Sequence, residues 1–203
     1  MYIDPSGEFV ITLSMILTAA AISAGVGATI GTGVAMYNDY HDDGTINGSI
    51  GLDNYLAYTV GGAVSGVGIG VCLSLGAAAG TAALLGSTAT LFTASGISVT
   101  FGTALAIGTS TAFITGMAGY SARVAISSSE KYNFNNMLIE GGFNALSGAV
   151  SVAGGYLAGV TGFRADYASK LLSRNTDVIY RLIFQNYFTI GIKSGLGYLK
   201  SVY

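Results

Sequence analysis

Long uncharged stretches dominate the pattern of hydrophobic and polar positions. Asp, Glu, Lys, Arg and His are absent from residues 9–38, a run of 30, and from residues 54–122, a run of 69. Leu, Ala, Ile and Met favour helix, and no proline follows Pro5 to interrupt one. About 20 apolar helical residues cross a hydrocarbon core of about 30 Å. The pattern predicts an all-α chain of glycine-rich hydrophobic helical hairpins that insert into a membrane.

The uncharged stretches divide into predicted helices at polar or glycine-rich points. The first span runs from Phe9 to Met36, and the last covers residues 141–163. One helix through residues 54–122 would be about 100 Å long, which no bilayer accommodates, so we expect this run to fold back. Loops or turns are expected at 37–53, 76–80, 93–96 and 123–140. Strands are the competing interpretation, but the chain lacks sustained alternation of polar and apolar residues.

Glycines recur at intervals of four residues within the predicted helices. On a helix this spacing puts them on one face, where two backbones approach closely and gain van der Waals contact. The glycines expected to pack in this way are Gly27, Gly31, Gly62, Gly66, Gly70, Gly76, Gly80, Gly155 and Gly159. The chain holds 31 glycines, so some pairs with this spacing arise by chance. One interpretation is that these helices associate in a membrane. The other is that the glycines form flexible linkers or helical hairpins packed inside a carrier protein.

The composition does not fit an ordinary water-soluble surface. Only 9% of the residues are charged and 51% are hydrophobic, with a mean hydropathy of +0.61, whereas soluble domains carry about 25% charged residues. The net charge of −2 is unevenly placed, because residues 1–163 carry −6 and residues 164–203 carry +4. We therefore expect no binding of nucleic acid by the acidic body. Cys72 is the only cysteine, which excludes an internal disulfide and a cysteine-cluster metal site.

Residues 164–203 form a separate basic and aromatic tail. Lys170, Arg174 and Arg181 fall within about 40° of one another on a helical wheel. Basic and aromatic side chains suit the headgroup region of a membrane. They equally suit docking to a partner protein, so lipid binding and partner binding by these three residues are alternatives.

Residues 39–47 match part of a calcium-binding loop. Asp39, Asp43 and the carbonyl of Thr45 are possible oxygen ligands. However, His41 stands at a position that such loops fill with oxygen, and Ile50 replaces the bidentate glutamate. A solvated turn is the alternative interpretation, and we expect neither a metal nor another cofactor.

The motifs of common enzyme classes are missing. His41 is the only histidine, and the chain has no G-x-S-x-G elbow, H-E-x-x-H pair or G-K-[ST] phosphate loop. The 40-residue tail is too short to build a core and an active site unaided. The sequence therefore predicts a protein that is not an enzyme.

The first residues resemble a known boundary motif. Residues 2–7, Tyr-Ile-Asp-Pro-Ser-Gly, resemble the Y-x-D-P-x-G boundary that closes the core of Rhs/YD-repeat polymorphic toxins. In that family a variable toxin region follows the boundary, and glycine- and alanine-rich apolar segments often come next. By this resemblance, residues 1–8 end a core-like boundary, residues 9–163 are the hydrophobic helical region, and residues 164–203 are the C-terminal tail.

The resemblance implies a secreted bacterial toxin used in competition between cells. We expect this region to insert into the membrane of the target cell and to permeabilise or depolarise it. The implied partners are target-membrane lipids, a cognate immunity protein and the Rhs shell of the parent protein, with self-association in the membrane as a further expectation. The alternative is a non-catalytic pre-toxin or translocation segment packed inside the Rhs shell.

Overall fold

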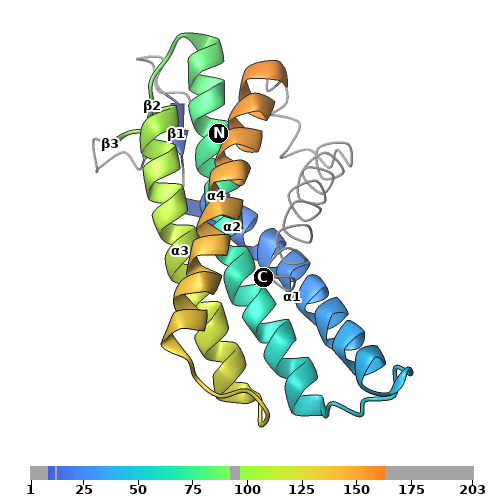
Figure 1. Ribbon diagram of the computed structural model, residues 1–203. Coiled ribbons are helices and arrows are strands. Elements are labelled where there is room, and N and C mark those ends of the chain that lie inside the picture. Colours follow the sequence, from blue (N-terminus) through green and yellow to red (C-terminus); the bar gives the residue numbers. More distant parts are fainter. Residues whose placement is uncertain (1–8, 12, 92–96, 163–203) are drawn as a thin grey trace.

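The computed structural model describes residues 9–11, 13–91 and 97–162 (Figure 1). Within these ranges the chain forms four long helices and three very short strands. In chain order they are β1 (Phe9–Ile11), α1 (Leu13–Asp43), α2 (Leu52–Leu85), β2 (Ala89–Leu91), β3 (Ile97–Ser98), α3 (Phe101–Ile126) and α4 (Phe134–Gly162). The prediction of an all-α architecture is confirmed, and the small sheet is an addition to it.

The helices are longer than the sequence pattern predicted. The expected turn at Gly76–Gly80 is wrong, because α2 continues through these residues without a break. The predicted loops at 37–53 and 123–140 are shorter than expected, since α1 extends to Asp43, α3 to Ile126, and α4 begins at Phe134. Polar residues interrupt a hydrophobic pattern without ending the helix. A helix is interrupted by proline or by an unfavourable backbone conformation. The predicted turn at 93–96 lies outside the described residues.

Specific residues end the helices. Gly44 follows α1 with φ +81°, and its amide donates to the carbonyl of Tyr40 at 2.8 Å. Gly86 ends α2 in the left-handed conformation, with φ +62°. Glycine adopts this conformation without the Cβ penalty that other residues incur. At the start of α3, Thr100 and Thr103 form a reciprocal capping box.

Helix α2 is the central element of the bundle. Figure 1 shows α1 leaning against one side of α2, with α3 and α4 on the other side. The largest fully buried apolar side chains are Leu75 and Cys72 of α2 and Val152 of α4. Alanines fill most of the remaining core, including Ala104 and Ala112 of α3. Small side chains therefore set the distance between these helices.

The contact between α1 and α2 is made by backbone against backbone. A Cβ built on Gly27 would overlap the carbonyl oxygen of Gly62, and a Cβ on Gly62 would overlap that of Gly27. The contact repeats every turn, with Gly31 against Tyr58, Gly66 against Ser23, and Gly70 against Ala19. The paired residue numbers rise on one helix as they fall on the other, so α1 and α2 are antiparallel. The repeat of four on both helices makes the contact continuous over about three turns.

Glycines also bring α2 and α4 together. Gly76 faces the carbonyl of Val152, and Gly80 faces that of Tyr156, so these two helices run parallel. From the opposite side, Gly155 and Gly159 each meet the backbone of α2 near Ala77. The structure thus places all nine glycines singled out in the sequence against the backbone of another helix.

The three strands form one small sheet in the order β1-β2-β3. β1 pairs in parallel with β2, and β2 pairs antiparallel with β3. The sheet ties the start of α1 to the connection between α2 and α3. It lies at the end of the bundle opposite to the α1–α2 and α3–α4 loops (Figure 1).

We predict that Gly27→Ala destabilises the packing of α1 on α2, whereas Gly25→Ala does not. The added methyl group at Gly27 meets the backbone of Gly62, and such overpacking costs about 1–3 kcal/mol. Gly25 lies in the same helix with nothing within 4 Å of a built Cβ, so alanine there gains up to about 1 kcal/mol of helix propensity. Thermal unfolding in mild detergent, followed by tyrosine near-UV circular dichroism, measures both variants. Equal transition midpoints for the two variants would contradict the close backbone contact between α1 and α2.

Candidate functional site

The charged side chains gather at one end of the bundle. Within residues 9–11, 13–91 and 97–162 they belong to the last turns of α1 and α3, the first turns of α2 and α4, and the loops between them (Figure 1). The set consists of Asp39, His41, Asp42, Asp43, Asp53, Arg123, Glu130, Lys131 and Glu140. We call it the charged cap. With six acidic and two basic side chains and a neutral histidine, its net charge is −4.

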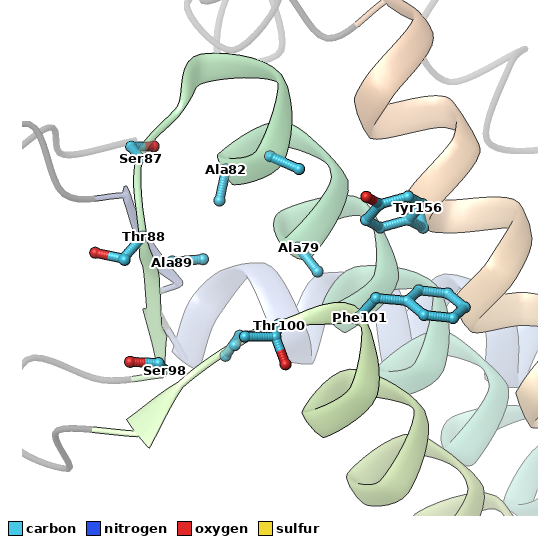
Figure 2. A pocket seen from close by; sticks show the side chains of 11 residues that line it. Ala79, Ala82, Ser87, Thr88, Ala89, Ser98, Thr100, Phe101 and Tyr156 are labelled. Atoms are coloured by element: carbon cyan, nitrogen blue, oxygen red, sulfur yellow. The ribbon is translucent and has the colours of Figure 1, made fainter.

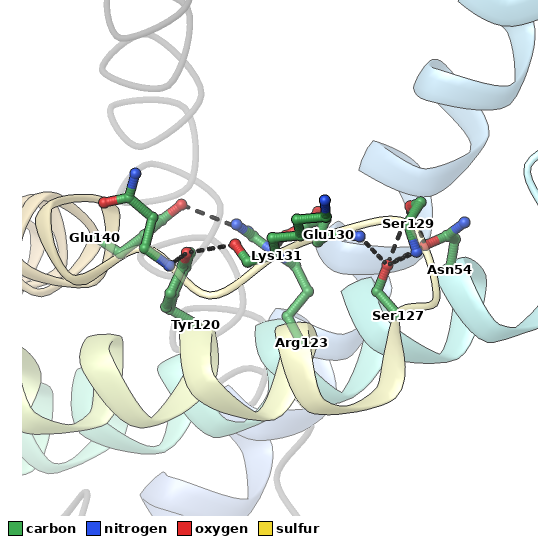
Figure 3. Close-up of polar contacts among 9 residues, drawn as sticks. Asn54, Tyr120, Arg123, Ser127, Ser129, Glu130, Lys131 and Glu140 are labelled. Atoms are coloured by element: carbon green, nitrogen blue, oxygen red, sulfur yellow. Dashed lines mark hydrogen bonds and ion pairs between the residues drawn. The ribbon is translucent and has the colours of Figure 1, made fainter.

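Arg123 is the centre of the charged cap on the α3–α4 side. Its guanidinium forms ion pairs with Glu130 at 3.0 Å and Glu140 at 3.4 Å. The same group lies over the rings of Tyr58 and Tyr120, 5.1 and 5.4 Å from their centroids. Figure 3 shows Arg123 rising from α3 toward the α3–α4 loop. One cation thus links α2, α3, the loop and α4.

Hydrogen bonds attach the α3–α4 loop to the start of α2. The Ser127 hydroxyl donates to the Asn54 side-chain oxygen, and the Ser129 hydroxyl donates to the same oxygen at 3.0 Å (Figure 3). The backbone amide of Ser128 donates to Asp53 at 2.9 Å. On the other side of the loop, the amide of Asn133 donates to the Tyr120 hydroxyl at 2.9 Å. The loop is therefore fixed at both ends.

Asp39 organises the α1–α2 loop. It lies in the last turns of α1, is fully buried, and accepts hydrogen bonds from the Gly48 amide, the Ser49 hydroxyl, the Ile50 amide and the Tyr55 hydroxyl. All four donor distances lie between 2.8 and 3.2 Å. One carboxylate therefore clamps the loop onto both helices.

Asp43 has a similar role within the same loop. Its carboxylate accepts from the amide and hydroxyl of Thr45 and from the amide group of Asn47. The proposed calcium ligands Asp39 and Asp43 are thus occupied by donors of the loop itself. In the described part of the chain, no group of three His, Cys, Asp or Glu side chains is placed to hold a metal. The assignment of these aspartates as metal ligands is not supported.

These two aspartates stay ionised at neutral pH. They follow Met36, beyond the roughly 20 residues of α1 that a hydrocarbon core requires. Burial raises the pKa of Asp39, but the hydrogen bonds that it accepts from Gly48, Tyr55, Ile50 and Ser49 outweigh this and leave its pKa below the usual range. Hydrogen bonds from Thr45 and Asn47 lower the pKa of Asp43. Two of the six carboxylates of the charged cap are therefore held in the charged form by hydrogen bonds.

The opposite end of the bundle carries no charged side chain among the described residues and contains a small cavity. The cavity measures about 270 Å³ and lies between the sheet and the ends of α2, α3 and α4 (Figure 2). Its lining is largely apolar, with Ala79, Ala82, Phe101 and Tyr156. The buried hydroxyl oxygen of Ser87 has no hydrogen-bond partner among the described residues. An ordered water commonly satisfies a single buried hydroxyl of this kind. The volume of the cavity is also smaller than that of most ligand sites, so the cavity does not indicate a ligand.

Between the two ends the outer surface is apolar. Large exposed side chains occur on every helix, including Leu17 of α1 at 57%, Ile114 of α3 at 64% and Leu157 of α4 at 62% exposure. Contiguous apolar surface of this kind marks an interaction with lipid or with another protein. All four helices are long and apolar enough to cross a membrane by length and composition. With 26 to 34 residues they are about 39–51 Å long, so their ends extend beyond a hydrocarbon core of about 30 Å.

The candidate site differs in part from the residues that the sequence suggested. The nine packing glycines lie inside the bundle, whereas Lys170, Arg174 and Arg181 lie outside the described residues. The sequence alone did not indicate that Glu130 and Glu140 pair with Arg123. The available signal was the charge of Arg123, the first to follow the long uncharged run.

Comparison of the chain with models of known protein families, with curated proteins and with solved structures found no match. The site therefore has to be interpreted from its own geometry.

We predict that Arg123→Gln destabilises the bundle by about 1–3 kcal/mol, because Glu130 and Glu140 lose their partner in a partly buried site. The side chains involved are 21–28% exposed, so solvent screening keeps the cost below that of a fully buried pair. Lys131→Gln is the matched control, since it removes a positive charge from an exposed position in the same loop. We expect its effect to stay within about 0.5 kcal/mol. Denaturant unfolding in detergent measures the free energy of unfolding of both variants. Equal losses would show that the ion pairs of Arg123 do not stabilise the bundle.

Proposed function

We propose that this chain is a membrane-embedding helical bundle that enters a lipid bilayer and makes it permeable. The observation that carries the proposal is the separation of charge along the bundle. Four apolar helices of bilayer-crossing length have every charged side chain of the described residues at one end. A bilayer accepts the uncharged length of such a bundle and leaves the charged cap in water.

The internal packing supports lipid as the surroundings. Glycine in the interior of a helix costs about 0.5–1 kcal/mol relative to alanine, so a water-soluble bundle gains little from so many of them. In lipid, helices are not driven together by hydrophobicity, and close contact between backbones supplies the attraction. The reciprocal contact of Gly27 with Gly62 has this character. Interior hydroxyls such as Thr32 and Thr59 add a hydrogen bond between helices at 2.8 Å.

The mode of permeation follows from how tightly the bundle is packed. Gly76, Gly80 and Gly155 bring α2 into backbone contact with α4, and Asn144 of α4 bonds to the Ala112 carbonyl of α3 at 2.6 Å. We infer that contacts this close leave no conduit between α2, α3 and α4. Permeation therefore requires several copies around a shared opening, which agrees with the expected self-association.

The biological setting of the proposal is competition between bacteria. It is supported by the likeness of residues 2–7 to the boundary of Rhs/YD-repeat toxins. In this setting the chain is secreted, acts at the membrane of the target cell, and is neutralised by an immunity protein. The absence of a conduit within one copy equally favours a second candidate, a non-catalytic pre-toxin or translocation segment held inside the Rhs shell.

We predict that the purified chain releases ions from liposomes, with a rate that rises more steeply than linearly with the protein-to-lipid ratio. The steep dependence follows from the requirement for several copies. Dye release from vesicles and the response of a voltage-sensitive dye measure it. A chain that floats with vesicles without leakage would favour the packed pre-toxin segment, and a chain that stays in solution would refute both membrane insertion and permeation.

We predict that Ile114→Arg prevents insertion, whereas Ile46→Arg does not. Ile114 lies midway along α3 and is 64% exposed, so arginine there would face the hydrocarbon core at a cost of about 3 kcal/mol. Ile46 has nearly the same exposure, 61%, but lies in the loop of the charged cap. Flotation with liposomes measures the fraction inserted. Equal flotation of the two variants would show that α3 does not cross the bilayer.

A further inference from the structure

We propose that the bundle adopts one orientation in the membrane, with the charged cap on the outer side and the start of α1, the α2–α3 connection and the end of α4 on the cytoplasmic side. This inference rests on the proposed membrane insertion and adds the side that each loop faces. It identifies the partner of the basic tail as the anionic cytoplasmic leaflet.

The order of the helices determines which segments share a side. Adjacent helices in the sequence are antiparallel, and α2 runs parallel to α4. The loops 44–51 and 127–133 therefore lie at one end of the bundle (Figure 1). The start of α1, the α2–α3 connection and the end of α4 lie at the other end. With four spans, the segments before α1 and after α4 emerge on the same side.

The charges at the two ends are of opposite sign. The charged cap has a net charge of −4, and its Arg123 is already engaged by Glu130 and Glu140. The segment that follows Gly162 carries +4 over residues 164–203, and Asp4 and Glu8, which precede α1, bring the net charge of the sequence beside this end to +2. Four of its basic residues fall within 20 positions of the end of α4, namely Arg164, Lys170, Arg174 and Arg181. No other Lys or Arg of the sequence precedes α1 or lies between α2 and α3.

Two independent forces favour the same orientation. Basic residues near the end of a span are retained on the cytoplasmic side, where the leaflet is anionic. A membrane potential that is negative inside draws the positive tail inward and opposes transfer of the acidic cap. Accepted hydrogen bonds hold the pKa values of Asp39 and Asp43 below the usual range, which favours the charged form of these two cap carboxylates. The reverse orientation would place the cap carboxylates against the anionic leaflet.

The chain offers a direct assay, because Cys72 is its only cysteine and is fully buried. Three single variants of the full chain are made: Ile46→Cys and Lys131→Cys in the two cap loops, and Thr88→Cys at the opposite end. At a protein-to-lipid ratio below the onset of leakage, checked by retention of a trapped dye, they are inserted from outside into vesicles containing phosphatidylglycerol, with a potassium-diffusion potential that is negative inside. A membrane-impermeant maleimide is then added, with the wild-type chain as the unlabelled control.

The expected result is labelling at positions 46 and 131 without detergent, and at position 88 only after detergent is added. Labelling at 88 with protection of 46 and 131 would overturn the orientation while leaving the spanning bundle intact. Partial labelling of all three would mean mixed orientations and would overturn the single orientation. Complete labelling of all three without detergent would show that the helices do not span, which would refute the proposed function as well. Protection of all three would also overturn the orientation.

The charge bias is tested by changing the tail. One variant combines Thr88→Cys with the loss of four positive charges beside α4. The four substitutions are Arg164→Gln, Lys170→Gln, Arg174→Gln and Arg181→Gln. We expect position 88 then to label in a substantial share of vesicles before detergent, with unchanged flotation. The matched control combines Thr88→Cys with Lys131→Gln, which removes a positive charge from the cap and should leave position 88 protected. If both combinations label alike, the basic tail does not set the orientation.

Discussion

The direct contact of one helix backbone with another, made possible by glycine, is the constraint on which this fold depends. Gly27 and Gly62 occupy each other's side-chain space, and the same contact recurs one turn further along in both directions. Carbonyl oxygens of one helix then lie against Cα atoms of the other, where weak hydrogen bonds add to van der Waals attraction. Because α2 makes such contacts with α1 on one side and with α4 on the other, it can occupy the centre of the bundle.

This way of packing leaves room inside for only a few large side chains, such as Leu75 and Val152. The core consists mainly of alanine and glycine, so residues such as Leu17, Ile114 and Leu157 are directed outward. A soluble protein commonly has the opposite arrangement, with large apolar residues inside and charge outside. The inversion follows from the close approach of the helices and needs no separate explanation. It is the arrangement that a lipid solvent favours.

The sequence predicted the helices and the packing glycines because both are encoded by local spacing. A glycine every four residues defines a helix face regardless of what that face meets. The partner of each face was not predictable, because Gly27, Gly76 and Gly155 belong to equivalent patterns. The Arg123 cluster was missed for another reason: its members are separated by up to 17 positions and meet only when α3 and α4 fold together. The strands were missed because two or three residues are too few to show alternation.

Asp39 shows that a residue singled out by a metal-binding pattern can organise a loop without a metal. The calcium-loop pattern depends on carboxylates that project from a loop. Here α1 continues past Asp39, so its carboxylate points along the helix end and binds the following loop instead. A cation would have to displace four hydrogen bonds from a buried group.

Backbone packing and the separation of charge together determine how the bundle behaves in water and in lipid. In water, the hydrophobic effect holds an interface between large apolar side chains together, and this effect is lost in lipid. A contact between glycine backbones keeps its van der Waals attraction in both solvents. The helices can therefore remain associated while the surroundings of their outer side chains change. The charged cap cannot make that change, because Arg123 and its carboxylates would be transferred into hydrocarbon. In the proposed insertion, the end that carries no charge among the described residues enters the lipid, and the charged cap limits how far the bundle enters.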